Sequence, residues 1–239
     1  LADVHAALAD TEVAAIFCLR GGWGSARLLD RIDTGLLRTH PKPFIGFSDI
    51  TALHALLARE DLVGFHAPMP GSNLVLDGNE DDARALFDLL MQPLSAGHRF
   101  EPSLAADAWR VPGRASGRLV GGNLSLVAAL LGTPWSWVTE GAILLLEDVS
   151  EALYRVDRLL TQLRLAGVLA GARGFLLGGF TEDADPSAVL HEHLAGLGKP
   201  VLTGWPAGHA TPNRGLPLGV QVTLDADTGT LTLEETVLK

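Results

Sequence analysis

A serine at position 48 stands where an apolar segment, residues 43–47, gives way to the helical pattern of residues 49–57. A serine at such a strand-to-helix junction is lifted onto a sharp turn, and the N–H groups that open the helix can stabilise a developing oxyanion. Gly46 permits close approach of the chain, although Ile50 replaces the second glycine of the usual G-x-S-x-G pattern. Ser48 is therefore a candidate nucleophile. The local alternative is a helix N-cap, because Ser and Asp favour that position.

A glycine-rich segment, residues 20–24 (Arg-Gly-Gly-Trp-Gly), follows the apolar run of residues 13–19. Glycines at the carboxyl end of a strand let backbone N–H groups face an anion, so this segment is a candidate phosphate cradle or half of an oxyanion hole. The alternative is a tight turn in which glycine supplies a positive φ. The segment does not match G-x-G-x-x-G and no Walker lysine follows it, which disfavours a nucleotide site.

Two carboxylates, Glu147 and Asp148, end the apolar run of residues 144–146, and a helical pattern follows them. A carboxylate at the end of a strand can orient a catalytic histidine, or it can cap the next helix. Of the eight histidines, His209 lies in a loop that contains proline and glycine, residues 206–213. Functional residues are disproportionately found in such loops. Glu147 and His209 are therefore candidates to activate a serine nucleophile.

No group of histidines, cysteines or carboxylates has the spacing of a metal site. His191 and His193 lie two apart in a helical pattern, which turns them to different faces. Cys18 is the lone cysteine and lies in an apolar run, which indicates a packing residue and excludes a disulfide framework. His54 falls in a largely apolar helical pattern, and His66 ends a short strand at a point where it could line a cleft. We expect no metal and no cofactor.

The composition is that of an acidic, apolar-rich chain. It has 239 residues, of which 47% are hydrophobic, and a formal charge of −10 from 28 acidic and 18 basic residues. This apolar content suffices for a core without disulfide or metal staples. No Lys/Arg-rich block is present, which disfavours a nucleic-acid partner. No apolar stretch approaches the roughly 20 residues that cross a bilayer, so no membrane partner is expected.

The first half of the chain alternates short apolar runs with helical patterns, which is typical of parallel βαβ units covered on both faces. The runs are residues 13–19, 43–47 and 62–66, and a predicted helix at residues 81–91 ends this unit. Three strands make a thin sheet, since sheets usually hold about four to six. The chain also opens inside a helical pattern, residues 4–9. We therefore expect that N-terminal strands are missing from this sequence.

Residues 92–116 are rich in Pro, Gly, Ser and Ala and have little periodicity, which is typical of an interdomain crossing. We expect a front α/β domain at residues 1–95, a linker at 96–116 and a mixed α/β back domain at 117–239. Helices of the back domain are predicted at residues 124–131, 151–169 and 186–194. Its strands are predicted at residues 117–120, 142–147, 174–180, 200–203, 219–224 and 230–233.

Seven short segments carry a family resemblance: residues 19–24, 42–53, 117–124, 132–134, 146–148, 154–160 and 208–209. In this order they resemble the LD-carboxypeptidase family, which includes muropeptide LD-carboxypeptidases and microcin-C immunity hydrolases. Each segment is short, but their ordered co-occurrence over most of the chain is specific. The resemblance implies a flavodoxin-like front domain with a parallel sheet, a smaller mixed α/β back domain, and an active site between the two.

The resemblance assigns a catalytic triad. In the family, the serine of the G-[YF]-S-D segment is the nucleophile, which corresponds to Ser48 here. The first glutamate of the L-E-[DE] segment corresponds to Glu147, and the histidine of the late G-H pair corresponds to His209. His209 would then take the proton of Ser48, and Glu147 would hold the imidazole in the correct tautomer.

The glycine-rich segment gains a role from the same resemblance. Backbone N–H groups of Asp49 and of Gly21 or Gly22 are the expected oxyanion donors. Arg20 is a candidate to bind the free carboxylate of a substrate, with a structural ion pair as the alternative. Trp23 stands where the family usually has tyrosine, beside this loop, and is a candidate substrate contact at the entrance.

The implied reaction is hydrolysis of a murein tetrapeptide between its third residue, diaminopimelate or lysine, and its terminal D-alanine. The implied setting is cytoplasmic peptidoglycan recycling by a homodimer. One alternative is cleavage of a peptidyl- or aminoacyl-nucleotide amide, which needs an aromatic surface that a 6% aromatic content does not make obvious. The other is a non-catalytic α/β binding protein in which Ser48 and Glu147 only cap helices. The enzyme interpretation requires His209 to lie within hydrogen-bonding reach of both residues.

Overall fold

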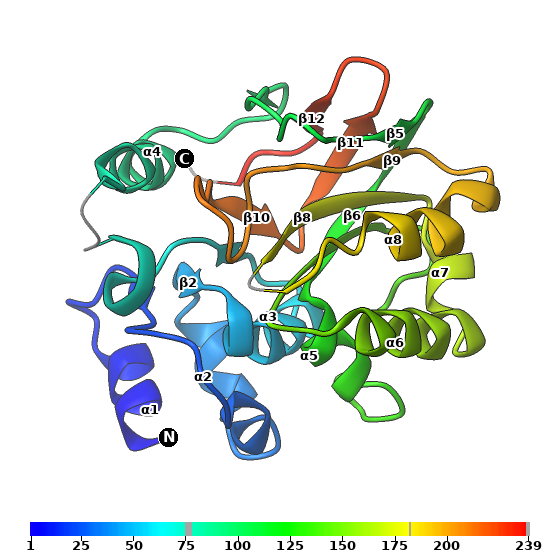
Figure 1. Ribbon diagram of the computed structural model, residues 1–239. Helices are drawn as coiled ribbons and strands as arrows, with labels where there is room; N and C mark the ends of the chain where they lie inside the picture. The colour runs from blue at the N-terminus through cyan, green and yellow to red at the C-terminus, as the bar shows by residue number, and fades with distance from the viewer. Residues whose placement is uncertain (75–77, 182, 238–239) are drawn as a thin grey trace.

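Two β-sheets organise the chain in the computed structural model, which describes residues 1–74, 78–181 and 183–237 (Figure 1). The smaller sheet has the strand order β1-β2-β3-β10, and the larger sheet has the order β4-β12-β11-β6-β7-β8-β9-β5. Strands β1, β2 and β3 run parallel in the smaller sheet, and strands β6, β7, β8 and β9 run parallel in the larger one. The predicted α/β fold with a parallel front sheet is therefore confirmed.

The smaller sheet combines the parallel strands β1 (Ile16–Phe17), β2 (Phe44–Gly46) and β3 (Gly64–His66) with β10 (Leu216–Leu218). Strands β2 and β3 are completely buried, as expected of parallel strands whose two faces are covered. The sequence pattern does not predict β10, because a proline stands at its centre. Pro217 is tolerated there since β10 is an edge strand, which pairs only with β3 in this sheet. A late segment of the chain thus completes the front sheet.

Among the described residues, the first half of the chain has the α-helices α1 (Ala2–Ala9), α2 (Thr34–Thr39), α3 (Thr51–Arg59) and α4 (Glu80–Met91). Helix α4 begins one residue before the prediction. The helix predicted from residue 49 begins as a 3-10 turn, Ser48–Ile50, and becomes α-helical at α3. A 3-10 turn at Ser25–Leu28 and a short π-turn at Pro70–Leu74 also lie in this part of the chain.

The larger sheet agrees with the predicted strands of the back half. Its strands are β4 (Arg99–Phe100), β5 (Arg110–Val111), β6 (Arg114–Asn123), β7 (Ile143–Val149), β8 (Gly174–Thr181), β9 (Val201–Leu202), β11 (Gln221–Asp225) and β12 (Thr230–Leu233). The segment predicted as a linker, residues 96–116, contains β4, β5 and the start of β6, and all three pair within this sheet. Strands of two residues have no readable periodicity, which is why the sequence pattern does not predict β4 and β5.

Four helices accompany the larger sheet: α5 (Leu124–Ala129), α6 (Leu153–Leu165), α7 (Val168–Gly171) and α8 (Ser187–Leu194). Figure 1 shows α5, α6 and α8 on one side of this sheet, with α3 beside α5. The single helix predicted over residues 151–169 is wrong in one respect, because it divides into α6 and α7. Gly167, with φ +79°, makes the left-handed turn that ends α6.

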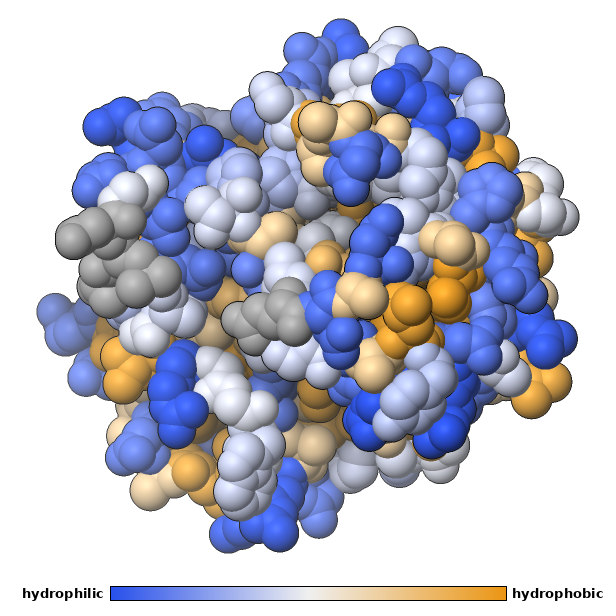
Figure 2. Space-filling model, viewed as in Figure 1, coloured by the Kyte–Doolittle hydropathy of each residue, from blue (hydrophilic) through white to orange (hydrophobic). Residues whose placement is uncertain are grey.

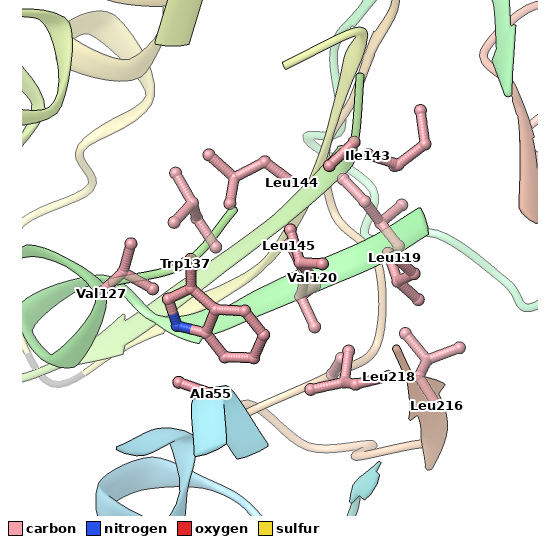
Figure 3. Close-up of a cluster of buried hydrophobic side chains, with 14 of the residues drawn as sticks. Ala55, Leu119, Val120, Val127, Trp137, Ile143, Leu144, Leu145, Leu216 and Leu218 are labelled. Carbon is pink, nitrogen blue, oxygen red and sulfur yellow. The ribbon is translucent and has the colours of Figure 1, made fainter. Parts of the chain in front are cut away.

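Apolar side chains at the junction of the two sheets hold the halves of the chain together. Figure 3 shows Leu216 and Leu218 of β10 near Leu119 and Val120 of β6, with Ala55 of α3 close by. All five are buried. Burial of a Leu or Val side chain stabilises a fold by about 1.5–3 kcal/mol. The strand that completes the front sheet is therefore also packed against the back one.

One face of the molecule is predominantly polar. On the face seen in Figure 2, hydrophilic residues predominate and apolar residues form scattered patches. Within the described ranges, no helix combines the length and the apolar character that a membrane crossing requires.

Candidate active site

Ser48 occupies a strained turn between β2 and α3. Its φ is +62°, a left-handed conformation that is uncommon for a residue other than glycine and costs of order 1–3 kcal/mol. Among the described residues, no side chain caps the 3-10 turn at Ser48–Ile50 or the start of α3. The helix-cap alternative for Ser48 is therefore wrong. Such strain at a polar residue is typical of a nucleophile held at the top of a sharp turn.

The glycine-rich loop lies directly against this turn. A Cβ atom at Gly21 would meet Cβ of Ser48 at 2.8 Å and its Oγ at 2.9 Å, so only glycine fits without movement. Gly22 has a φ of +124°, which a residue with a side chain rarely adopts. Oδ2 of the buried Asp49 accepts a hydrogen bond from the backbone N–H of Ser25 at 2.8 Å, which ties the end of the loop to the serine turn.

Gly21→Ala is expected to lower kcat/KM by roughly 10²- to 10³-fold, the effect of losing one oxyanion donor. The added methyl group would displace either the Ser48 side chain or the loop. Steady-state kinetics of the full chain measure the loss, with Gly196→Ala as the matched control. A Cβ at Gly196 meets no atom within 4 Å, and its φ lies outside the left-handed region. Equal activity of both variants would contradict a role for the Gly21 segment.

Glu147 and His209 form a hydrogen-bonded pair. Glu147 lies in β7 and is completely buried, and its Oε2 accepts from Nδ1 of His209 at 2.6 Å and from the backbone N–H of His209 at 3.2 Å. Burial raises the pKa of Glu147, and the hydrogen bonds from His209 oppose that rise. With Nδ1 as donor to a carboxylate, Nε2 is the nitrogen of the neutral imidazole that can accept a proton. A histidine held in this way by a carboxylate is able to act as a general base.

Glycines let the histidine loop approach this pair closely. A Cβ atom at Gly208, whose φ is +93°, would lie 2.2 Å from Oε2 of Glu147. Gly178 and Gly179 of β8 face the same loop, and their Cβ atoms would lie 2.5 Å from the carbonyl of Ala207 and 2.3 Å from Cβ of Ala210. These two residues are not among the candidates that the sequence motifs predict. A Gly-Gly pair at the end of a buried strand is the signal for such a close approach.

Phe47 connects the serine turn to the histidine. Its ring lies between two imidazoles, with centroids 4.8 Å from His209 and 5.9 Å from His66, both at steep interplanar angles. The structure thus brings Glu147 and His209 into direct contact and places Ser48 one residue from a ring that packs on His209. His66 does not line a cleft, because it is completely buried beneath Phe47.

Two buried histidines are expected to make stability depend on pH. The pKa of His54 is lowered to about 4 and that of His66 to about 3, and the main cause in both cases is desolvation by burial. The unfolded chain binds protons at both as pH falls through about 6.5, whereas the folded chain binds them only near the lowered pKa values. Stability should therefore fall by a few kcal/mol per histidine between about pH 6.5 and pH 4.

Denaturant unfolding measured at several pH values tests this expectation. His66→Leu removes one titrating group at a position where neither ring nitrogen has a hydrogen-bond partner among the described residues. The variant should lose part of the pH dependence. An unfolding free energy of the parent that stays constant over this range would contradict the prediction.

Asp148, beside the catalytic candidate, has a structural role. Its Oδ1 accepts from Nδ2 of Asn123 at 2.7 Å, and its Oδ2 accepts from the backbone N–H of Ser125 at 2.9 Å. The side chain of Asn123 in turn accepts from the backbone N–H of Leu126 at 3.2 Å, which caps α5. The two adjacent carboxylates thus have different partners. Asp148 binds the residues at the start of α5, and Glu147 binds His209.

Arg20 and Trp23 lie at the surface beside the glycine-rich loop. Nη1 of Arg20 donates to the backbone carbonyl of Gly21 at 3.3 Å, and no ion pair of Arg20 occurs within the described chain. Trp23 is 83% exposed, and the guanidinium carbon of Arg27 lies 5.6 Å from its ring centroid. Both side chains are accessible to a ligand.

A hollow of about 200 Å³ borders the histidine loop, and Gly178, Gly179 and Ala210 belong to its lining. A larger cavity of about 800 Å³, lined in part by Arg118 and Trp135, includes none of the predicted site residues. Across the described ranges, no three His, Cys, Asp or Glu side chains gather in a way that could hold a metal ion.

Comparisons with known proteins identify the family of the chain. Models of the LD-carboxypeptidase N-terminal and C-terminal domains match residues 1–67 and 116–224. A probable murein peptide carboxypeptidase of Bacillus subtilis is 37% identical, over 98% of this chain and 76% of that protein. The muramoyltetrapeptide carboxypeptidase of Oxalobacter formigenes has a TM-score of 0.82 at 31% identity, covering 97% of this chain and 80% of the other.

A further solved structure shares the fold. The microcin C7 self-immunity protein MccF, in complex with aspartyl sulfamoyl adenosine, has a TM-score of 0.91 at 24% identity, covering 100% of this chain and 81% of the other. At this identity the likeness shows the fold alone. The two domain models and the 37% identity over almost the whole chain show that the protein belongs to the LD-carboxypeptidase family of peptidases.

Proposed function

We propose that the protein is a serine carboxypeptidase that cleaves the bond between the third residue of a murein tetrapeptide and its terminal D-alanine. The observation that carries the proposal is the short hydrogen bond of 2.6 Å between His209 and the buried Glu147, close to the strained turn of Ser48. The names of the Bacillus and Oxalobacter relatives supply the substrate class. A cytoplasmic role in peptidoglycan recycling and a homodimeric state belong to the same proposal and rest on the family resemblance.

The mechanism follows from the residue types. Ser48 attacks the carbonyl of the third residue, and Nε2 of His209 takes the serine proton and then gives it to the departing amine of D-alanine. Glu147 keeps the proton on Nδ1 and stabilises the imidazolium that forms. Water then hydrolyses the acyl-enzyme by the same route in reverse order.

Backbone N–H groups stabilise the charge that develops on the carbonyl oxygen. The proposed donors are Asp49, which follows the serine, and Gly21 or Gly22, whose loop lies against Ser48. Each such donor contributes about 3 kcal/mol to lowering the barrier. Arg20 is the proposed partner for the terminal carboxylate of the substrate, because its guanidinium is exposed and makes no ion pair within the described chain. Trp23 is proposed to contact the substrate at the entrance.

Cleavage of an aminoacyl-nucleotide amide is the second candidate. One observation favours it: the largely exposed indole of Trp23, with Arg27 beside it, is an aromatic surface at the edge of the site on which a base could stack. The same surface can contact a sugar or a peptide, so the murein reaction remains the preferred proposal.

The test is a comparison of substrates with the full chain. Release of D-alanine from L-Ala-γ-D-Glu-meso-diaminopimelyl-D-Ala should be measured beside release from the same peptide ending in L-alanine. An aspartyl-adenylate amide is the third compound. The proposal predicts cleavage of the D-alanine peptide only. Cleavage of the nucleotide amide alone would select the second candidate, and folded protein that cleaves nothing would favour the non-catalytic alternative.

A further inference from the structure

Hydrogen bonds fix the loop that carries His209, residues 206–214, both at its ends and inside it. The backbone N–H of Arg214 donates to the carbonyl of Pro206 at 2.6 Å, which brings the two ends of the loop together. Inside the loop, the side-chain oxygen of Asn213 accepts from the backbone N–H of Gly208 at 3.0 Å. Asn213 is completely buried, so this hydrogen bond is shielded from water. Gly208 is the residue immediately before the histidine.

The carboxylate of Asp82, which belongs to helix α4, binds Asn213 from outside the loop. Oδ2 of Asp82, on α4, accepts from the backbone N–H of Asn213 at 2.8 Å. Oδ1 of Asp82 lies 3.4 Å from Nη1 of Arg214, which also donates to the carbonyl of Asp81 at 2.6 Å. Asp82 is only 3% exposed, and a buried carboxylate is retained where charged and hydrogen-bonding partners satisfy it.

The histidine is therefore held from two sides. On one side, a single oxygen of Glu147 accepts from both the backbone N–H and Nδ1 of His209. On the other side, the Asp82–Asn213 bridge fixes the preceding peptide through Gly208. Because Gly208 has no side chain and a φ of +93°, its backbone is intrinsically free to move, and its position depends on such contacts.

We propose that Asp82 and Asn213 are positioning residues for the catalytic histidine: the front helix α4 sets, through Asn213, where the imidazole of His209 lies against Glu147. The inference rests on the proposed function for its effect on catalysis, but the geometry of the pair is testable without a substrate. A displacement of about 1 Å at a reacting group lowers a rate by roughly 10²-fold. The bridge should therefore act on kcat and leave KM nearly unchanged, because neither residue is a proposed catalytic group or substrate contact.

Two substitutions remove the bridge and one preserves its key oxygen. Asp82→Ala removes the acceptor for the N–H of Asn213, and Asn213→Ala removes the acceptor for the N–H of Gly208. Each should lower kcat on the tetrapeptide by roughly 10- to 100-fold. Asp82→Asn retains an oxygen that can accept from Asn213 and should restore most of the activity. Proton NMR gives a readout that needs no substrate, namely the strongly deshielded signal expected of the Nδ1 proton of His209. This signal should broaden or disappear in the two alanine variants. It should persist in Asp82→Asn.

Two controls separate positioning from loss of stability. Arg84→Ala changes the exposed face of the same helix, where Arg84 pairs with Asp81 at 2.9 Å, and should leave kcat unchanged. Leu160→Ala opens a cavity in α6 and lowers the melting temperature without touching the loop. The proposal is overturned if both alanine variants keep the parental kcat and proton signal, or if Leu160→Ala lowers kcat as much at an equal loss of stability. If the parent does not cleave the tetrapeptide, the proposed function fails, and the proton signal alone decides the positioning role.

Discussion

Ser48→Ala is expected to abolish release of D-alanine from the murein tetrapeptide, with kcat lower by at least about 10³-fold and up to about 10⁶-fold. The hydroxyl oxygen is the only atom removed, and the loss follows because Ser48 is the proposed nucleophile that forms the acyl-enzyme. The residual rate reflects binding and the oxyanion donors acting on water. Measurement of D-alanine by a coupled assay, with circular dichroism to verify folding, gives the ratio directly.

The backbone of Ser48 offers an internal control for this experiment. Alanine keeps the strain of the φ of +62°, whereas Ser48→Gly relieves it and should raise stability by about 1 kcal/mol or more. Both variants should be inactive, and only the glycine variant should melt at a higher temperature. Equal release by the parent and by Ser48→Ala would exclude this residue as the nucleophile.

Glu147→Gln is expected to lower kcat by about 10⁴-fold, the effect of breaking the carboxylate–imidazole pair in other serine hydrolases. The amide has the size of the carboxylate but lacks its charge, and its NH₂ group can turn toward the ring and favour the tautomer with the proton on Nε2. Complete burial leaves no water to compensate. The measurement is kcat across a range of pH, together with the deshielded Nδ1 proton, which should be lost.

Asp148→Asn is the matched control for Glu147→Gln. It removes a buried carboxylate one residue away, but its partners are Asn123 and Ser125 instead of the histidine. We expect it to lower stability and to change kcat much less than Glu147→Gln. If the two variants lose activity equally, or if Glu147→Gln keeps the parental kcat, the orienting role of Glu147 would be refuted.

Local sequence patterns determined much of this protein. The periodicity of residues 81–91 and 186–194 predicted α4 and α8 nearly to their ends, because the contacts that stabilise a helix lie within a few residues of one another. The apolar runs predicted β6, β7 and β8 for a different reason, because parallel strands whose two faces are buried are almost continuously apolar. Ordered short motifs identified the family and marked Ser48, Glu147 and His209 as the candidate triad, since the residue types that chemistry requires are read directly from the chain.

Other features were decided only by the tertiary structure. Strand β10 carries a central proline, and its pairing with β3 joins residues about 150 positions apart, for which no periodic signal exists. His66 is completely buried and packs against Phe47, a residue 19 positions earlier in the chain. The hydrogen bond from Asn213 to Asp82 spans 131 positions and depends on where α4 comes to rest. Sequence alone determined which side chains are available for catalysis, because that is a matter of residue type. The tertiary structure decided which of them meet, because contacts between distant segments arise only when the sheets pack.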